Sequence, residues 1–190
     1  SVTVRRSEVE TIEYNRDKGV GVTVYLGKQR GHASTSDFSL KAVRETVEAA
    51  LSIARFTATD EAAGLADAEL LAHDVADIDL FHPWALPVED AIELARSCEA
   101  AALGVDPRIT NSEGAAVSTH RGVRAYGNSL GFLAAVPGTV HSVSCSVLGS
   151  EGEQMERDYW YSTVRDWREL ESAESVGRRA GERAVGRLGA

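Results

Sequence analysis

The alternation of apolar and polar residues is clearest between residues 108 and 161, where it predicts a meander of four or five short antiparallel strands. Val143, Cys145 and Val147 alternate with serines, and a period of two places these three side chains on one strand face. Turn-forming residues stand at the expected strand ends, because glycine and asparagine tolerate positive φ and proline cannot donate to a sheet ladder. These turn signals are Glu113-Gly114, Gly127-Asn128 and Pro137-Gly138. We expect the other elements to pack against this sheet.

A second region of strand pattern opens the chain. Its predicted strands cover residues 2–14, 20–26 and 32–35, with turns at 15–19 and 27–31. The middle strand alternates valines with polar residues or glycine, which is typical of a half-buried strand. The pattern therefore predicts a three-stranded antiparallel sheet at the N-terminus.

Helical periodicity predicts three helices, over residues 40–55, 87–103 and 167–188. Ser39 is a suitable N-cap for the first helix, and Gly104 is a suitable stop for the second. The last helix contains Gly177, Gly181 and Gly186. Each glycine weakens a helix by about 1 kcal/mol relative to alanine, so tertiary packing must hold this helix. The predicted fold class is α+β, with an antiparallel or mixed sheet covered by about three helices.

Residues 57–87 lack a regular period and form the connector between the first two predicted helices. Residues 80–84 (LFHPW) are its expected apolar anchor. Its aspartates resemble a calcium loop in composition. However, the D-x-[DN]-x-[DN]-G spacing and the closing glutamate are missing, so we interpret the segment as a solvated connector rather than a metal site.

Composition narrows the class of protein. A chain of 190 residues can form one large domain or two small ones and buries roughly 70% of its unfolded surface. The formal net charge of -9 argues against sequence-independent phosphate binding, so we expect no direct nucleic-acid partner. The sequence contains neither a secretory h-region nor an apolar run of about 18 residues. We therefore expect a cytoplasmic protein that does not enter a membrane.

The two cysteines both fall on predicted buried faces. Cys98 lies in the second predicted helix, and Cys145 lies on the apolar face of a predicted strand. Two buried thiols are the favoured interpretation, and a reducing compartment is compatible with them. A disulfide bridge between them stays open at this point.

Motif searches assign no catalytic, cofactor-binding or metal-binding residue. The histidines are His32, His73, His82, His120 and His141. They are not spaced as a helical or hairpin metal pair, and no H-E-x-x-H, H-E-x-x-x-H or C-x-x-C occurs. The serines in residues 31–34 and 127–131 do not match the G-x-S-x-G nucleophile motif. We interpret residues 127–131 as a hairpin turn rather than a phosphate-binding loop.

Two charged stretches have alternative interpretations. In residues 155–159, alternation places Glu156 and Asp158 on one face and Arg157 on the other. This stretch is either a charged functional cluster or an edge strand whose charges discourage edge pairing, and we favour the edge strand. The last helix carries a basic face made of Arg178, Arg179, Arg183 and Arg187. That face could attract an anionic partner, but the net charge favours an exposed or interdomain face.

Six short motifs, taken together and in order, resemble a known family. They lie at residues 11–15, 21–25, 79–83, 108–114, 127–129 and 155–159. In this combination the chain resembles the N-terminal domain of the PmbA-type (TldE) subunits of the TldD/PmbA metallopeptidase family. The likeness extends over nearly the whole chain.

The resemblance implies that residues 1–190 are the N-terminal domain of a longer bacterial protein, whose C-terminal metallopeptidase-type domain is not part of this sequence. In that family the TldD-type subunit carries a zinc motif, H-E-x-x-x-H, and the PmbA-type subunit lacks it and pairs with TldD as a heterodimer. None of the zinc ligands has a matching position here, so the resemblance implies no cofactor in this segment and zinc in a TldD-like partner.

The resemblance leaves two functional interpretations. The first is a domain of a peptidase complex that acts on unfolded or peptide substrates, in peptide-antibiotic maturation and antitoxin turnover. In this case the edge of the meander, residues 140–161, admits peptide by β-augmentation or packs on the partner subunit. The second is a non-enzymatic interaction module that modulates DNA gyrase, as an older family name suggests. Whether this chain is itself part of an enzyme stays open.

Overall fold

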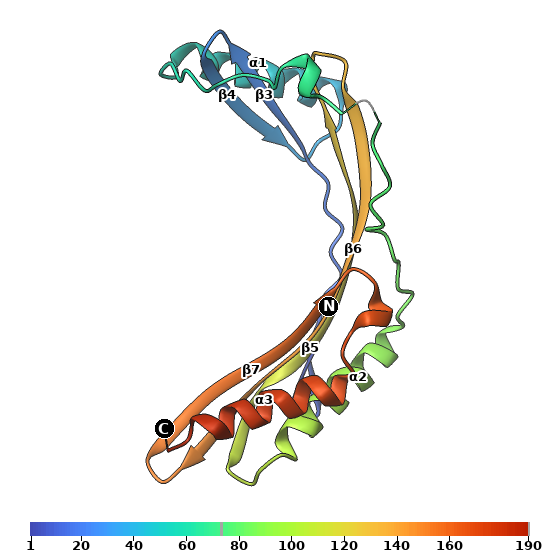
Figure 1. Ribbon diagram of the computed structural model, residues 1–190, viewed down its shortest axis with the longest axis vertical. Helices are drawn as coiled ribbons and strands as arrows, with labels where there is room; N and C mark the ends of the chain where they lie inside the picture. Colours follow the sequence, from blue (N-terminus) through green and yellow to red (C-terminus); the bar gives the residue numbers. More distant parts are fainter. Residues whose placement is uncertain (73, 190) are drawn as a thin grey trace. The chain divides into compact units, whose positions relative to one another are not determined.

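The computed structural model describes residues 1–72 and 74–189, and it separates into two compact units (Figure 1). The first unit comprises residues 1–14, 76–126 and 134–190, and the second comprises residues 15–75 and 127–133. Each unit combines its own antiparallel sheet with one or more helices. The predicted α+β class is therefore confirmed.

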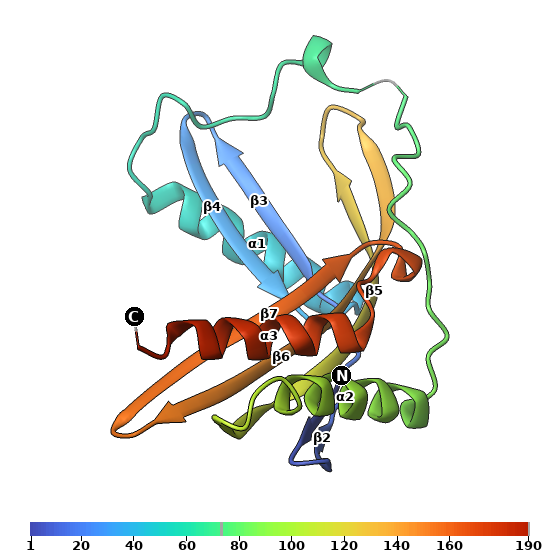
Figure 2. The ribbon, with the colours of Figure 1, turned by 60° about the horizontal axis from the view of Figure 1, so that its bottom comes forward.

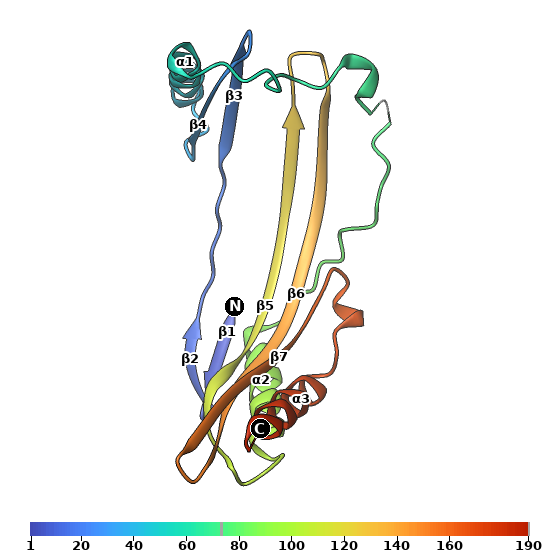
Figure 3. The same cartoon turned by 60° about the vertical axis from the view of Figure 1, so that its left-hand side comes forward.

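A five-stranded sheet forms the framework of the first unit. Its strands are β1 (Val2–Arg5), β2 (Glu8–Ile12), β5 (Ile109–Gly127), β6 (Leu133–Glu151) and β7 (Gln154–Val164). Their order is β2-β1-β5-β6-β7, so β2 and β7 are the two edges (Figure 3). Neighbouring strands β1–β2, β1–β5 and β6–β7 pair antiparallel.

The predicted meander is confirmed, since β5, β6 and β7 are consecutive neighbours in the sheet. Its strands are fewer and longer than predicted, because β5 runs for 19 residues through the expected turn at Glu113-Gly114, and β6 runs for 19 residues through the one at Pro137-Gly138. Gly114 stays within β5 at φ +110°, a conformation that glycine adopts without steric cost. Pro137 stays within β6 because pairing with β7 starts only at His141, opposite Val164. The missing proline N–H therefore removes no hydrogen bond from the β6–β7 ladder.

The predicted N-terminal sheet is confirmed in part: residues 20–26 and 29–35 pair antiparallel, but the opening strand does not join them. Residues 2–12 form the hairpin β1–β2, and β1 joins the large sheet by pairing with β5. The hairpin turns at Arg6 and Ser7, whose φ angles are 52° and 63°. Val2 and Val4 are 4% and 0% exposed. Burial of these valines in the larger core explains why the opening strand leaves its neighbours in sequence.

Two helices, α2 (Val88–Leu103) and α3 (Ala173–Arg187), lie side by side on one face of the large sheet (Figure 2). They approach closely at two glycines of α3. A Cβ at Gly177 would overlap the Cys98 carbonyl oxygen, and one at Gly181 would lie 2.6 Å from the Ala102 carbonyl oxygen. The prediction that tertiary packing holds this glycine-containing helix is confirmed.

The last helix, α3, starts later than predicted, because Trp167–Glu169 is a separate short 3₁₀ turn.

The core of the first unit lies between these helices and the sheet. It consists mainly of small and β-branched residues, including Ala95, Ala180 and Val147, each 0% exposed. Cys98 and Cys145 are buried there as free thiols, as predicted. A hydrogen bond with Cys98, together with burial, raises the pKa of the Cys145 thiol, so this cysteine is chemically inert.

The second unit packs α1 (Leu40–Phe56) on a two-stranded sheet, β3 (Val20–Leu26) and β4 (Gln29–Thr35). The Ser39 hydroxyl accepts the Ala42 N–H at 3.2 Å, which confirms the predicted N-cap. The hairpin turn predicted at residues 127–131 is also confirmed, since the Asn128 N–H donates to the Phe132 carbonyl at 3.0 Å and closes it.

The described residues of the connector are largely irregular, as predicted, apart from a short 3₁₀ turn at Ala68–Leu70. Its predicted apolar anchor belongs to the first unit and packs there against β6. The Thr139 N–H donates to the Leu80 carbonyl at 2.8 Å, and the Thr139 hydroxyl accepts the His82 N–H at 2.9 Å. Trp84 stacks on Trp167 with ring centroids 5.4 Å apart.

Candidate functional site

The five-stranded sheet has one face that α2 and α3 cover and an opposite face, called the open face here, on which neither helix lies (Figure 3). On β6 the open face carries Ser142, Ser144 and Ser146, which are partly exposed. Hydroxyls of neighbouring strands meet there, since Ser142 and Thr163 are hydrogen-bonded at 2.9 Å. This face is polar and remains accessible to a ligand.

A shallow hollow of about 390 Å³ lies in the open face. Its lining comes from four strands: Thr3, Glu113 to Ala116, Ser144 to Ser146, Arg157 and Tyr159. Arg157 pairs with Glu113 at 3.2 Å, and the Ser146 hydroxyl donates to Glu113 at 2.7 Å. These two contacts hold the pKa of the Glu113 carboxyl below its usual range. Glu113 is therefore ionised at neutral pH and is a weak general base.

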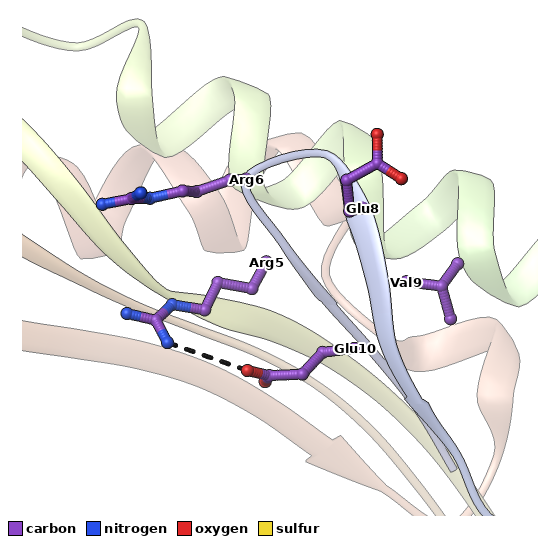
Figure 4. A pocket seen from close by; sticks show the side chains of 5 residues that line it. All are labelled: Arg5, Arg6, Glu8, Val9 and Glu10. Carbon is purple, nitrogen blue, oxygen red and sulfur yellow. Dashed lines mark ion pairs between the residues drawn. The ribbon is translucent and has the colours of Figure 1, made fainter.

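A second hollow, of about 320 Å³, lies beside the β1–β2 turn (Figure 4). It is lined by Arg5, Arg6, Glu8, Val9 and Glu10. Arg5 and Glu10 point toward each other, 3.7 Å apart, and Arg5 also donates to the Ser112 carbonyl at 2.9 Å. Because Arg5 is bound to β2 and β5, and Arg6 donates to Asn111 of β5, these side chains hold the hairpin on the sheet.

The outer edge of β7 is free, because the described part of the chain places no strand beyond it. The Tyr159 N–H donates to the Asp158 carboxylate at 2.8 Å and therefore points away from β6. The N–H and C=O of one strand residue point to the same side, and the sides alternate along the strand. Hence the backbone groups of Arg157, Tyr161 and Thr163 also point outward. The interpretation of residues 155–159 as an edge strand is confirmed.

Glu156 and Asp158 share one face of β7, as alternation predicted, and in the fold this face lies against the basic side of α3. Arg183 pairs with Asp158 at 3.2 Å, and Arg187 pairs with Glu156 at 3.2 Å. Burial opposes ionisation of Asp158, but the Tyr159 N–H and the two arginines outweigh it and hold the pKa of this carboxyl below its usual value. The basic helix face is thus partly neutralised by the strand beneath it.

The histidines of the described residues lie at separate places on the strands and the connector, except that His141 approaches the backbone of His82. His32 contacts Thr23 on the second unit's sheet, at 3.0 Å, while His120 is exposed on β5. His141 is 1% exposed, and its Nε2 lies 2.9 Å from the His82 carbonyl. His82 lies between two carboxylates, 3.2 Å from Asp79 and 3.7 Å from Asp166. His73 lies outside the described residues.

No local pattern could indicate the contact between His82 and Asp166, because these residues are 84 positions apart in the chain. The serines of the two glycine-containing motifs are equally uninformative, since Ser34 lies on β4 and Ser129 lies in the turn after β5. The β7 edge is the element that sequence patterning did locate.

Comparison of the sequence with models of protein families shows the family of this chain. The model of the PmbA/TldA metallopeptidase central domain matches residues 81–188, and the model of domain 1 of the same family matches residues 1–54. The chain belongs to the PmbA/TldA metallopeptidase family. Within this family it corresponds to an N-terminal PmbA/TldE domain, as the resemblance predicted.

Relatives of this family are longer proteins. The chain is 47% identical to metalloprotease PmbA of Escherichia coli O157:H7 over 99% of its length, and 44% identical to a PmbA homologue of Haemophilus influenzae. It spans 42% of the length of each.

Solved structures show the same fold. A candidate modulator of DNA gyrase from Bacteroides thetaiotaomicron has a TM-score of 0.87 and 25% identity, covering 99% of this chain and 43% of that one. TldE from Thermococcus kodakarensis has a TM-score of 0.68 and 16% identity, covering 97% and 41%.

The family name implies a metal. Within residues 1–72 and 74–189, no group of three or more His, Cys, Asp or Glu side chains is arranged to hold an ion. His141, the buried histidine, directs one nitrogen at a backbone carbonyl. The donor side chains of the described residues therefore do not fit a metal centre. In the same described part, no helix is long and apolar enough to cross a membrane.

Proposed function

We propose that this chain is the N-terminal domain of a PmbA-type (TldE-like) subunit in a cytoplasmic zinc metallopeptidase complex. In this proposal the domain binds or admits unfolded or peptide substrates, and a TldD-like partner subunit supplies the zinc and the cleavage. Peptide maturation and antitoxin turnover are the processes it would serve. The family membership and the identity of 47% to metalloprotease PmbA of Escherichia coli support this assignment.

The free edge of β7 is the observation that carries the peptide-binding role. An extended peptide can add to such an edge through main-chain hydrogen bonds, which do not depend on side-chain identity. A peptidase of low sequence specificity needs this kind of recognition. The open face next to the edge leaves room for alternate side chains of the peptide. The same surface could instead pack on the partner subunit.

Hydrogen exchange on the assembled full-length complex tests the role of the edge. If peptide adds to β7, the outward amides of Arg157, Tyr161 and Thr163 become protected when peptide is added. Unchanged protection of residues 140–161 on peptide addition would reject the substrate role. Protection that appears on adding the partner subunit alone would assign this edge to subunit packing.

Metal content tests the assignment of the subunit. We expect the full-length protein, purified alone, to contain no stoichiometric zinc, and peptidase activity to require the partner subunit and to disappear with a chelator. A stoichiometric zinc in the protein purified alone would mean a TldD-type catalytic subunit instead.

A second candidate function is a non-enzymatic module that binds DNA gyrase. The name of the structural neighbour from Bacteroides thetaiotaomicron favours it. The net charge of -9 favours a contact with the gyrase protein over one with DNA. Gyrase binding that persists without the TldD-like partner would support this candidate, and its absence in a pull-down with purified gyrase would exclude it.

A further inference from the structure

The outer edge of β7 is bordered on its helix-covered side by a row of arginines. Arg179, Arg183 and Arg187 follow one another at intervals of four residues along α3. On the core side of α3, Ala184 and Leu188 lie over Gly149 of β6. The arginine row therefore lies farther out, over β7. Arg179 and Arg183 lie over the ring of Trp160, at 5.2 and 5.5 Å from its centroid.

Each arginine of this row is more exposed than the carboxylate it pairs with. The exposed fractions are 48% for Arg183 against 7% for Asp158, and 57% for Arg187 against 38% for Glu156. Arg179 is 52% exposed, against 32% for Glu171. The acids lie beneath, and the guanidinium groups form the outer surface. A ligand that approaches this edge therefore meets positive charge first, although the chain as a whole is negative.

The guanidinium groups also keep unused donors. A guanidinium has five N–H donors, and Arg183 uses Nε and Nη2 on Asp158. Arg187 uses Nε on Glu156, with Nη1 3.7 Å from Asp158. The remaining N–H groups can bind a further carboxylate, and arginine does so in bidentate geometry.

The open-face side of the same edge is different. Tyr159 and Tyr161 stack with ring centroids 6.2 Å apart and are 53% and 55% exposed. Aromatic side chains pair favourably with apolar or aromatic neighbours on an adjacent strand. An added strand would alternate its side chains between the tyrosine pair and the arginine row.

We propose that the β7 edge selects extended peptides that carry carboxylates at alternate positions, with apolar side chains between them. The carboxylates bind the arginine row of α3, and the apolar side chains pack on Tyr159 and Tyr161. This inference rests on the proposed peptide-binding function and adds the chemical class of the peptide. The repulsion from the net charge of -9 is screened over about 8 Å at physiological ionic strength, so the local arginines determine the preference.

Fluorescence anisotropy with the 190-residue chain tests the preference. The probes are fluorescein-labelled peptides of about ten residues with alternating Glu and Val, the same peptide with Lys in place of Glu, and an acidic peptide N-methylated at every second amide. We expect the acidic peptide to bind at least about tenfold more tightly than the basic one, a difference of about 1.4 kcal/mol. N-methylation should abolish binding, because the methyl groups block main-chain pairing.

Variants of the arginine row test whether its charge causes the preference for the acidic peptide. Replacing Arg179 and Arg187 together by Gln should reduce the preference for the acidic peptide to less than about threefold, because their ion pairs are exposed and the fold does not depend on them. The control is Arg178→Gln, an exposed arginine of the same helix that lies outside the row. It should leave the preference unchanged.

A second pair of variants tests whether the peptide binds to the main chain of the β7 edge. Tyr161→Pro removes an outward N–H and keeps the ladder with β6, so it should prevent binding, whereas Tyr161→Ala keeps the N–H and should weaken it modestly. Equal affinity for the acidic and basic peptides would overturn the charge preference while leaving the peptide-binding function in place. Failure of every peptide to bind would overturn both.

Discussion

The helix-covered face and the open face of the five-stranded sheet alternate along the same strands and differ in what lies against them. On β6, Val143, Cys145 and Val147 are at most 2% exposed, while Ser144 and Ser146 between them stay accessible. The two covering helices, α2 and α3, approach each other closely because glycines and alanines form their contact. Stability therefore resides on one face, and the other face and its β7 edge are free for binding. Substitutions on the two faces should separate these roles.

The largest expected effect concerns Glu99, a carboxylate of α2 that is 1% exposed. It accepts the N–H groups of Arg6 and Ser7 at 2.8 and 2.7 Å and thereby holds the β1–β2 turn. Glu99→Ala leaves both donors without this acceptor, so the free energy of unfolding should fall by about 3 kcal/mol in urea denaturation. Glu93→Ala on the same helix, whose side chain is 68% exposed, is the control and should change it by less than about 0.5 kcal/mol. A loss below about 1 kcal/mol for Glu99→Ala would contradict this account.

The close approach of α2 and α3 is tested by two glycines of one helix. Gly177→Ala places a Cβ against the Cys98 backbone, which cannot move aside without shifting α2. We expect a loss of about 2 kcal/mol from overpacking, even though alanine favours the helix. At Gly186 no atom lies within 4 Å of an added Cβ. Gly186→Ala should therefore stabilise by about 0.5 to 1 kcal/mol, and a similar loss at both positions would argue against close packing as the cause.

Two valines of β6 compare the faces directly. Val147 is 0% exposed under the helices, and Val140 is partly exposed on the open face. Val147→Thr buries a hydroxyl in place of a methyl group and should cost about 1.5 kcal/mol. Val140→Thr should cost less than about 0.5 kcal/mol, since its hydroxyl can reach water. Equal costs in chemical denaturation would mean that the open face is buried in solution.

Local signals explain what the sequence could predict. The helices over residues 40–55 and 87–103 were found because Ser39 and Gly104 mark their ends within the chain itself. The face alternation of β7 was found for the same reason. The pairing of β1 with β5 joins residues more than 110 positions apart, as in Val4↔Ala115 and Val2↔Val117, and no local pattern encodes it. Likewise, no local pattern indicates that Pro137 fits inside β6, which depends on β7 pairing no further than His141.

The β7 edge shows the same contrast between local patterns and contacts that are distant in sequence. Alternation placed Glu156 and Asp158 on one side of β7, but it could not indicate that Arg183 and Arg187 lie above them. That contact depends on α3 returning across the sheet. The alternation in the sequence thus located the edge strand. The positive charge along its outer border became visible only in the folded structure.

The smallest effect is expected at the exit of β7, where Asp166 turns the chain toward α3. Its hydrogen bonds from the Arg168 side chain, the shortest at 2.7 Å, lower the pKa of the Asp166 carboxyl to about 2. An unfolded aspartate titrates near 3.9, so the folded state binds fewer protons between about pH 4 and pH 2. The stabilisation is complete above this window and is lost as the pH falls through it.

Asp166→Asn should therefore show a shallower loss of stability than the wild type from pH 4 to pH 2, measured by urea denaturation at each pH. The exposed Asp17→Asn serves as the control, and a slope unchanged by Asp166→Asn would show that this carboxylate does not hold the strand exit.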